Sequence, residues 1–420
     1  MGKIIKAILA YVVSWMFFFP LSFTFLPDSI NSKMLMAVLG VGFLWKDLVD
    51  RRSGFVAKQS VILMFMTAMM FSLICYATTV INSTTTADYT TYFVSMVVWW
   101  AAAYASYAMI RYAHGEVNIK LIGIYIIMLC VGQGLISFLF YVSHPVYTFF
   151  SQFFNIQEAT AKSGTRLCGL GTSADTGGIR YAVSLVFIAY LMLQSKASRK
   201  ELVMYSICFC AIIVLGNMMA RTTTVGALLA LFYIIYKAMG RNDNIRNAKP
   251  LLTLCLVGLC IVPVFLLVNA IFPQAAELYE FAFEGFYNYI ETGNWSTSST
   301  NVLIEMWKIW PNTIKTWLIG DGLFIDPNDS SLYYMGTDVG YARFVFFCGL
   351  LGLSVFALFF AYIVRTLCER FPLHKELFIL LLIMVFAIWI KVTTDIFFVF
   401  ALLLCISQED ERGIQYENSI

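Results

Sequence analysis

Charged side chains are scarce in this chain. Asp, Glu, Lys and Arg make up 13% of its 420 residues, whereas 60% are hydrophobic and the mean hydropathy is +0.77. A soluble globular domain carries about 25% charged residues, so this composition excludes that class. Apolar runs of about 20 residues, the length of a spanning helix, recur throughout, whereas a membrane β-barrel has shorter alternating segments. We therefore expect an all-α polytopic integral membrane protein, with residues 1–420 forming a single transmembrane domain.

Histidine is rare, and cysteine occurs mainly in apolar segments that we expect to be helical. The chain has three histidines, and no cluster of His, Cys and carboxylates has the spacing of a metal site. Most cysteines lie in apolar runs, where a thiol behaves as a small hydrophobe. Cys168, in a predicted outer loop, has no outer partner, which argues against a disulfide framework. Gly320 and Gly322 lack the GxxxxGK context of a phosphate loop. We expect no metal and no cofactor.

The apolar runs and the loop charges together predict about 12 helices with both termini cytoplasmic. The expected helices are residues 4–25, 33–46, 60–81, 90–110, 120–142, 176–194, 202–220, 223–239, 251–272, 338–364, 376–390 and 395–407. The first run follows Lys3 and Lys6 and lacks a cleavage site, so we expect a spanning helix rather than a removed signal peptide. The last two helices share one apolar run, in which Lys391 and Asp395 could pair across one helical turn.

Two outer segments are long: residues 143–175 and the large loop 272–337 between the ninth and tenth helices. Long loops in compact proteins are usually functional or disordered, and these are rich in aromatics, which favours order. In the large loop four glutamates share one face of an expected interfacial helix, and residues 296–300 can cap a second helix over 301–310. The glutamates are Glu277, Glu280, Glu284 and Glu291. Its tryptophans either anchor the loop at the membrane boundary or offer a platform for sugar stacking.

Four outer arginines lie at or just inside helix ends: Arg166, Arg180, Arg221 and Arg343. A cation within a membrane segment costs about 2.5–3.5 kcal/mol on insertion scales, so such a position indicates a function or a buried partner. Each arginine alone could extend to lipid head groups. Together they suggest a cationic pocket, open to the outer leaflet, that grips a lipid-linked phosphate or pyrophosphate with paired donors.

Asp338 precedes Arg343 at the start of the tenth helix, with Tyr341 between them. A carboxylate at this depth is costly unless it is paired. Asp338 is therefore either the structural partner of an arginine or a general base that nearby arginines keep ionised. The two roles are compatible, and Tyr341 would lie near the same face.

The end of the large loop carries a pattern that resembles the O-antigen polymerase (Wzy) family, within the wider group of lipid-carrier glycosyltransferases that includes O-antigen ligases. A glycine turn, GDG at 320–322, is followed by TDVGYARFVFFCGLLG, with an Asp–Tyr–Arg pattern leading into Gly349 and Gly352. The segment RTTTVGALLALFY from Arg221 is similar to the family's arginine-led helix. Ligases typically have a histidine where this chain has Asp338. Many relatives carry an arginine before the tryptophan helix, where Asn301 stands here.

The resemblance implies a metal-independent membrane glycosyltransferase of the bacterial inner membrane that acts in lipopolysaccharide biosynthesis. It would transfer the growing glycan from undecaprenyl pyrophosphate onto a new lipid-linked repeat unit at the periplasmic face. The expected catalytic residues are Asp338, Arg343 and Arg221, and the expected substrate-binding residues are Arg166, Arg180 and Tyr341. The expected partners are the undecaprenyl-pyrophosphate-linked oligosaccharide, the bilayer, a chain-length regulator (Wzz-like) and the flippase, with no nucleic acid.

Three alternatives remain at this point. An O-antigen ligase would use similar chemistry, and a lipid-linked oligosaccharide flippase or other transporter can also have about 12 helices. Transporters tend to show related halves and broken helices at the bilayer midplane, whereas this chain has one large loop on one side and no evident repeat. A purely structural partner of a chain-length regulator would leave the charges within the membrane unexplained.

Overall fold

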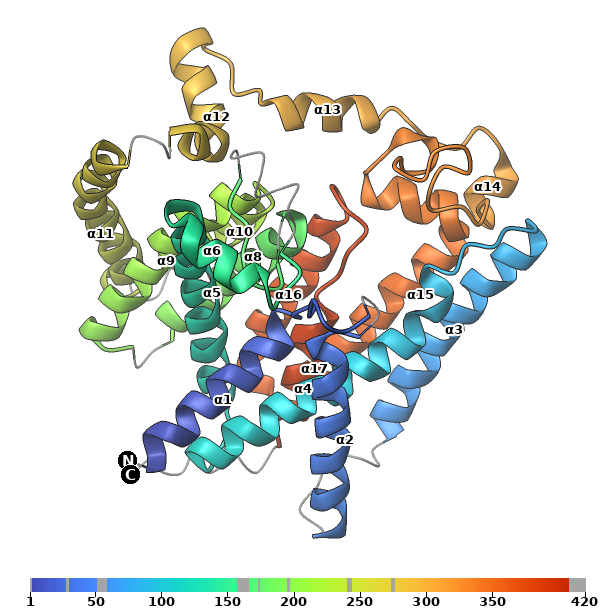
Figure 1. Ribbon diagram of the computed structural model, residues 1–420, viewed down its shortest axis with the longest axis horizontal. Helices are drawn as coiled ribbons and strands as arrows, with labels where there is room; N and C mark the ends of the chain where they lie inside the picture. The colour runs from blue at the N-terminus through green and yellow to red at the C-terminus, as the bar shows by residue number, and fades with distance from the viewer. Residues whose placement is uncertain are drawn as a thin grey trace. The chain divides into compact units, whose positions relative to one another are not determined.

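A computed structural model describes residues 2–27, 30–50, 59–156, 166–172, 174–194, 197–239, 244–272 and 276–407 of the chain. Figure 1 shows its helices in chain order. The helices that match predicted spans are α1 (Gly2–Phe18), α2 (Ser32–Val49), α3 (Gln59–Ile81), α4 (Tyr92–His114), α5 (Ile119–Val142), α8 (Ala174–Met192), α9 (Arg199–Met219), α10 (Thr223–Ala238), α11 (Asn244–Ile271), α15 (Gly340–Arg370), α16 (Lys375–Ile388) and α17 (Phe397–Cys405). Each expected segment therefore contains an α-helix.

The all-α membrane class is confirmed. The described part of the chain has no β-strand, only isolated bridges such as Ser22 with Asn31. In that part five helices are long and apolar enough to cross a membrane: Val61–Ile81, Tyr89–His114, Ile119–Val142, Arg199–Met219 and Gly340–Arg370. The chain is therefore a membrane-embedded helical protein, and the full number of spans and their orientation stay predictions.

Shorter helices form between the long ones. They are η1 (Tyr89–Thr91), α6 (His144–Ser151), α12 (Ala276–Thr292), α13 (Ser298–Met306), α14 (Ile314–Leu318), η3 (Tyr334–Gly336) and, after α15, η4 (Pro372–His374). Both helices expected in the large loop are present. The Thr297 side chain caps α13 by accepting from the Thr300 amide, as the Ser/Thr run predicts. Residues 157–165, 173 and 273–275 of the two outer segments lie outside the described residues.

The chain packs as two compact units. Unit 1 comprises Met1–Leu35 and Met109–Trp295, and α8 is its centre, with α5, α9 and α10 packed around it. Every residue of α8 from Gly177 to Met192 is buried. Helix α10 approaches it closely at Gly226, where an added Cβ would lie 2.3 Å from the Ala182 Cα. Helix–helix contact in a membrane depends on such small residues, because lipid removes the hydrophobic drive for association.

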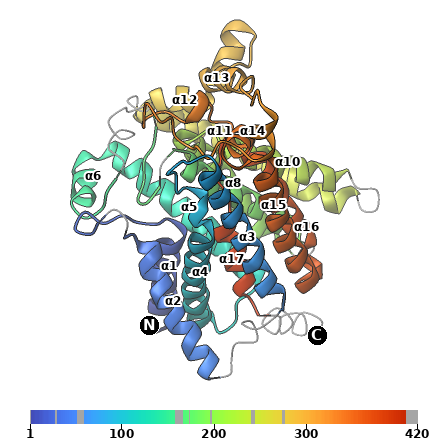
Figure 2. The same cartoon turned by 90° about the vertical axis from the view of Figure 1, so that its right-hand side faces the viewer.

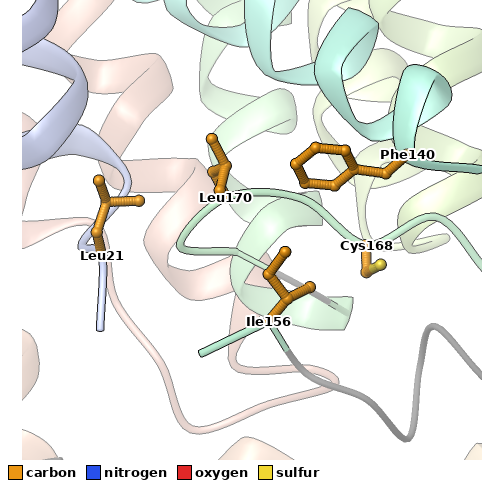
Figure 3. Packing of buried hydrophobic residues seen from close by; sticks show 5 residues of the cluster. All are labelled: Leu21, Phe140, Ile156, Cys168 and Leu170. Atoms are coloured by element: carbon orange, nitrogen blue, oxygen red, sulfur yellow. The ribbon is translucent and has the colours of Figure 1, made fainter. Parts of the chain in front are cut away.

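A hydrophobic cluster joins the segment after α1 to the loop before α8 within unit 1. Its buried members are Leu21, Phe140, Ile156, Cys168 and Leu170 (Figure 3). They come from the segment after α1, from α5 and from both described ends of the loop between α6 and α8. Cys168 is a buried free thiol in this cluster and packs there as a small apolar side chain. The loop that carries Arg166 is therefore fixed on its C-terminal side.

Unit 2 comprises Met36–Ala108 and Ser296–Ile420. Helices α3 and α15 lie side by side in it (Figure 1, Figure 2). Aromatic stacking fills the space between α3, α15 and α16: the Phe356 ring stacks on Phe71 at 4.3 Å and on Trp389 at 5.2 Å between centroids. Such ring pairs stabilise a packed core beyond their buried area.

Helix α15 is kinked at Gly349, and the kink holds the glycine turn of the large loop. Gly349 has φ 65° and ψ −176°, a conformation that favours glycine. The Phe346 and Phe347 carbonyls accept hydrogen bonds from the amides of Asp321 (2.6 Å) and Gly322 (3.1 Å). The predicted tight turn is confirmed, since Gly320 and Gly322 have φ 87° and 69°. The end of the large loop is thus fastened to the outer part of α15.

The chain between α16 and α17 is not helical, so the one-turn spacing that predicted a pair of Lys391 with Asp395 does not apply. The Asp395 carboxylate accepts from the Tyr92 hydroxyl (3.2 Å) and from the Phe397 amide (2.7 Å). Three backbone carbonyls of this break accept hydrogen bonds from elsewhere in unit 2. Trp389 O accepts from the Tyr341 amide, Ile390 O from the Trp307 indole and Thr393 O from the Tyr89 hydroxyl. Non-helical backbone at membrane depth is tolerated when its polar groups are satisfied in this way.

The kink generates a prediction about stability. In Gly349→Ala the new Cβ would lie 2.2 Å from the Leu318 carbonyl oxygen at a positive φ, so α14 must move away from α15. Strain of this kind costs about 1–3 kcal/mol, and we expect a lower midpoint in thermal unfolding of the detergent-purified protein. The control is Gly258→Ala in α11, where the added Cβ meets nothing within 4 Å. Equal midpoints for the two variants would contradict this role of Gly349.

Candidate functional site

The first cationic site lies at the start of α15 in unit 2. The helix begins at Gly340 rather than at residue 338, because Val339 has an extended ψ of 117°. Asp338 therefore precedes the helix, and it reaches Arg343 from outside the first turn: Nη1 of Arg343 lies 3.3 Å from Oδ1 of Asp338. The predicted pairing of Asp338 with an arginine is present, and its role as a general base stays a prediction.

The Arg343 guanidinium is buried between two rings and is only partly bonded. Its residue is 5% exposed, and Cζ lies 3.5 Å from the Tyr333 ring centroid and 3.8 Å from that of Phe324. Nε and Nη2 have no hydrogen-bond partner among the described residues. Aromatic faces attract a cation, but they do not satisfy N–H donors. Two donors of a rigid, planar fork that suits an oxyanion are thus buried without a hydrogen-bond partner among the described residues.

Other charges surround this guanidinium. The Asp338 side chain is 29% exposed, so the pair is open to solvent on the carboxylate side. Asp88, just before η1, lies close enough for the charge of Arg343 to lower the pKa of its carboxyl, against a larger raising effect of desolvation. Sequence reasoning missed Phe324, Tyr333 and Asp88. For the first two the available signal was their place between the glycine turn and Asp338, in a segment with no apolar run of its own.

Tyr341 faces a different neighbour from the one expected. Its hydroxyl donates to the Phe386 carbonyl at 3.0 Å, and its ring packs edge-on against Trp389. The predicted helical spacing from Asp338 fails because Asp338 is not in the helix. Tyr341 therefore fixes α15 against α16, and a contact with sugar stays a prediction.

Helix α13 packs over the entrance of α15 within unit 2. Met306, Trp307 and Trp310 contact the buried cluster of Val339, Ala342 and Phe346. The Trp310 and Trp317 rings stack at 5.5 Å and 5°, and the Trp317 indole donates to the Pro311 carbonyl. The indoles are thus ordered by contacts within the protein, beside the segment that carries Asp338.

A second cationic site lies in unit 1, where Arg166 and Arg221 share one ring. Their Cζ atoms lie 4.5 Å and 4.3 Å from the centroid of Phe281 in α12. Arg221, between α9 and α10, also donates from Nε to the Phe281 carbonyl at 3.0 Å and forms an ion pair with Glu284. Burial lowers the pKa of Arg221, Glu284 raises it, and the nearby charge of Arg166 lowers it. The structure therefore brings together two of the predicted arginines.

Arg180 is engaged differently. It is 8% exposed, its Nε donates to the Phe18 carbonyl, and its Nη1 donates to the Thr176 carbonyl at 2.7 Å. The bond to Phe18 ties α8 to the end of α1, and the bond to Thr176 lies within the first turns of α8. Binding of substrate by Arg180 stays a prediction, but its geometry is that of a structural arginine.

Arg180 generates a test of that distinction. Because hydrogen bonds to charged groups contribute about 1.5–3 kcal/mol, Arg180→Gln should lower the midpoint of thermal unfolding of the purified protein. Arg365→Gln, at an exposed arginine that pairs with Glu369, should leave the midpoint unchanged. If Arg180→Gln melted like the unsubstituted protein and yet lost function in cells, a ligand role for Arg180 would replace the structural one.

Comparison with known proteins adds no family to this description: no protein-family model, no curated protein and no solved structure matches the chain.

Proposed function

We propose that this protein is an O-antigen polymerase. The observation that carries the proposal is the burial of Arg343 against two aromatic rings, with Nη1 3.3 Å from Oδ1 of Asp338 and with Nε and Nη2 lacking a hydrogen-bond partner in the described part of the chain. A membrane protein keeps such a guanidinium only where a partner or a ligand repays its burial. The planar guanidinium fork matches the oxygens of a phosphate group with paired donors, as it does those of a carboxylate. The motif around these residues is also the part of the chain that most resembles the polymerases.

The reaction requires little from the protein beyond position and charge. A hydroxyl of the new lipid-linked repeat unit attacks the anomeric carbon of the donor glycan, and the bond from that carbon to the pyrophosphate oxygen breaks. Undecaprenyl pyrophosphate leaves with the bonding electrons, and Asp338 accepts the proton of the acceptor hydroxyl. The arginines stabilise the charge that develops on the leaving group. Holding both lipids in one orientation supplies much of the remaining acceleration.

The residues take different roles in this proposal. Arg343 and Arg221 are charge ligands of the reaction, Asp338 is the base, and Arg166 binds the substrate. Arg180 supports the site by fixing α8. Tyr341 shapes the sugar pocket indirectly, since it holds α15 against α16. The ordered indoles of residues 307–317 provide flat faces for sugar rings beside Asp338.

The break between α16 and α17 favours an enzyme over a transporter. Broken helices in transporters leave backbone carbonyls to coordinate the driving ion. Here the carbonyls of Trp389, Ile390 and Thr393 each accept a hydrogen bond from another part of unit 2. Packing within unit 2 therefore occupies these three carbonyls of the break. The proposed location is the bacterial inner membrane, where the flippase and a chain-length regulator would be the partners.

The proposal predicts the outcome of substitutions in a strain that lacks the native gene. Loss of a general base typically costs about 10²- to 10⁴-fold in rate, so Asp338→Asn should reduce lipopolysaccharide to core plus a single repeat unit. Arg343→Ala should do the same, because the leaving group loses its charge ligand. The control is Glu305→Gln, which removes an exposed carboxylate of the same loop that pairs only with Lys308 among the described residues. Electrophoresis of extracted lipopolysaccharide, with protein quantified by immunoblot, gives the readout.

Full-length O-antigen ladders from both Asp338→Asn and Arg343→Ala, at normal protein levels, would contradict the assignment of this site as catalytic. The deletion strain itself separates the alternatives. A polymerase defect leaves core carrying one repeat unit, a flippase defect leaves core without any O-antigen, and a ligase defect leaves lipid-linked polymer that is not attached to core.

A further inference from the structure

The two arginines around Phe281 in unit 1 form an unusual pair of like charges. Both guanidinium carbons lie within 4.5 Å of the centroid of one ring. The ring attracts each cation and so offsets part of the repulsion between them. Glu284 pairs with Arg221, whereas Arg166 has no ion pair within the described part of the chain. The pair therefore keeps positive charge that one carboxylate does not balance.

We infer that Arg166 and Arg221 bind the two phosphoryl groups of a polyprenyl diphosphate and that Glu284 occupies Arg221 until this ligand displaces it. The inference rests on the proposed function and names the ligand and its competitor at one of its sites. A diphosphate diester carries about two negative charges and offers each guanidinium a pair of oxygens. It thus matches two cations held over one ring, whereas Glu284 brings a single carboxylate, which pairs with Arg221.

Helix α12 is built so that Glu284 can leave without unfolding the helix. Its backbone departs from helical geometry at Phe283, with φ −120° and ψ 22°, directly before Glu284. Leu278 and Tyr279, before the kink, are buried. Beyond the kink Phe286 is 58% exposed and Ile290 is 80% exposed. The buried part anchors α12, and the ion pair of Glu284 with Arg221 holds the segment just after the kink.

Phe281 and Glu284 would then have separate tasks. Phe281 is a positioning residue, since its ring gathers both guanidiniums and its carbonyl accepts from Nε of Arg221. Glu284 competes with the ligand for the same arginine. Removing the competitor should strengthen ligand binding, whereas removing the ring should weaken it.

The test uses the full-length protein in nanodiscs of phosphatidylethanolamine and phosphatidylglycerol, with binding measured by microscale thermophoresis. The probes are undecaprenyl diphosphate, undecaprenyl monophosphate and inorganic pyrophosphate. A partly exposed ion pair is worth up to about 1 kcal/mol, so Glu284→Gln should bind undecaprenyl diphosphate up to about fivefold more tightly. Glu280→Gln, at an exposed carboxylate of the same helix, should match the unsubstituted protein. Arg221→Gln and Phe281→Leu should each weaken binding.

Hydrogen exchange of residues 284–292 provides a second readout. Undecaprenyl diphosphate should speed exchange there in the unsubstituted protein, and in Glu284→Gln exchange should already be fast without it. Unchanged or weaker affinity in Glu284→Gln would overturn the competition. Equal affinity for the monophosphate would overturn the assignment of two phosphoryl groups, and binding of inorganic pyrophosphate without the lipid would overturn the lipid ligand.

These measurements do not depend on polymerisation. If the binding results are as expected but Asp338→Asn still gives full-length O-antigen ladders, the diphosphate site is supported and the proposed polymerase chemistry is contradicted. In the reverse case, Asp338→Asn gives single-unit lipopolysaccharide and Glu284→Gln binds with unaltered affinity. That result would support the polymerase function and contradict the competition at Arg221.

Discussion

The contact between the glycine turn and the kink of α15 determines where the buried arginine of unit 2 can lie. At Gly349 the helix bends, and the carbonyls of Phe346 and Phe347 bond to amides of the turn at residues 321 and 322. Phe324 follows that turn by two residues, so the hydrogen bonds between the turn and α15 also position its ring against the guanidinium of Arg343. Without it, Arg343 would face lipid or water on that side, and its burial would be far more costly.

In this chain aromatic rings repeatedly contact the guanidinium groups of arginines. Arg343 lies between Phe324 and Tyr333, and Arg166 and Arg221 lie over Phe281. A ring stabilises the cation without occupying all of its N–H donors. Arg180 and Arg370 donate to backbone carbonyls, and Arg221 also donates to the Phe281 carbonyl. The bond of Arg180 to Phe18 joins two helices, whereas Arg343 keeps Nε and Nη2 without a hydrogen-bond partner among the described residues.

The sequence was most informative where a structural signal lies within a short stretch of the chain. Long apolar runs located a helix in each expected segment, and the Ser/Thr run before α13 located its cap, because both signals are local. The break between the last two helices was also located, whereas the start of α15 and the partners of Arg180 were not predictable in this way. Each depends on contacts between residues far apart in the chain, such as the bond of Arg180 to the Phe18 carbonyl. Loop aromatics such as Tyr333 carry no periodic signal at all.

The same reasoning explains why four arginines that look alike in sequence differ in the structure. Insertion cost marks every arginine near a helix end equally, since it depends on depth alone. They differ in the nearest element: the end of α1 offers a carbonyl to Arg180, whereas α12 offers Arg221 both a carbonyl and a ring face, and the segment after the glycine turn offers ring faces to Arg343. Aromatic residues of the large loop therefore determine the surroundings of Arg221 and Arg343. The loop contributes to the proposed chemistry by holding these cations in place.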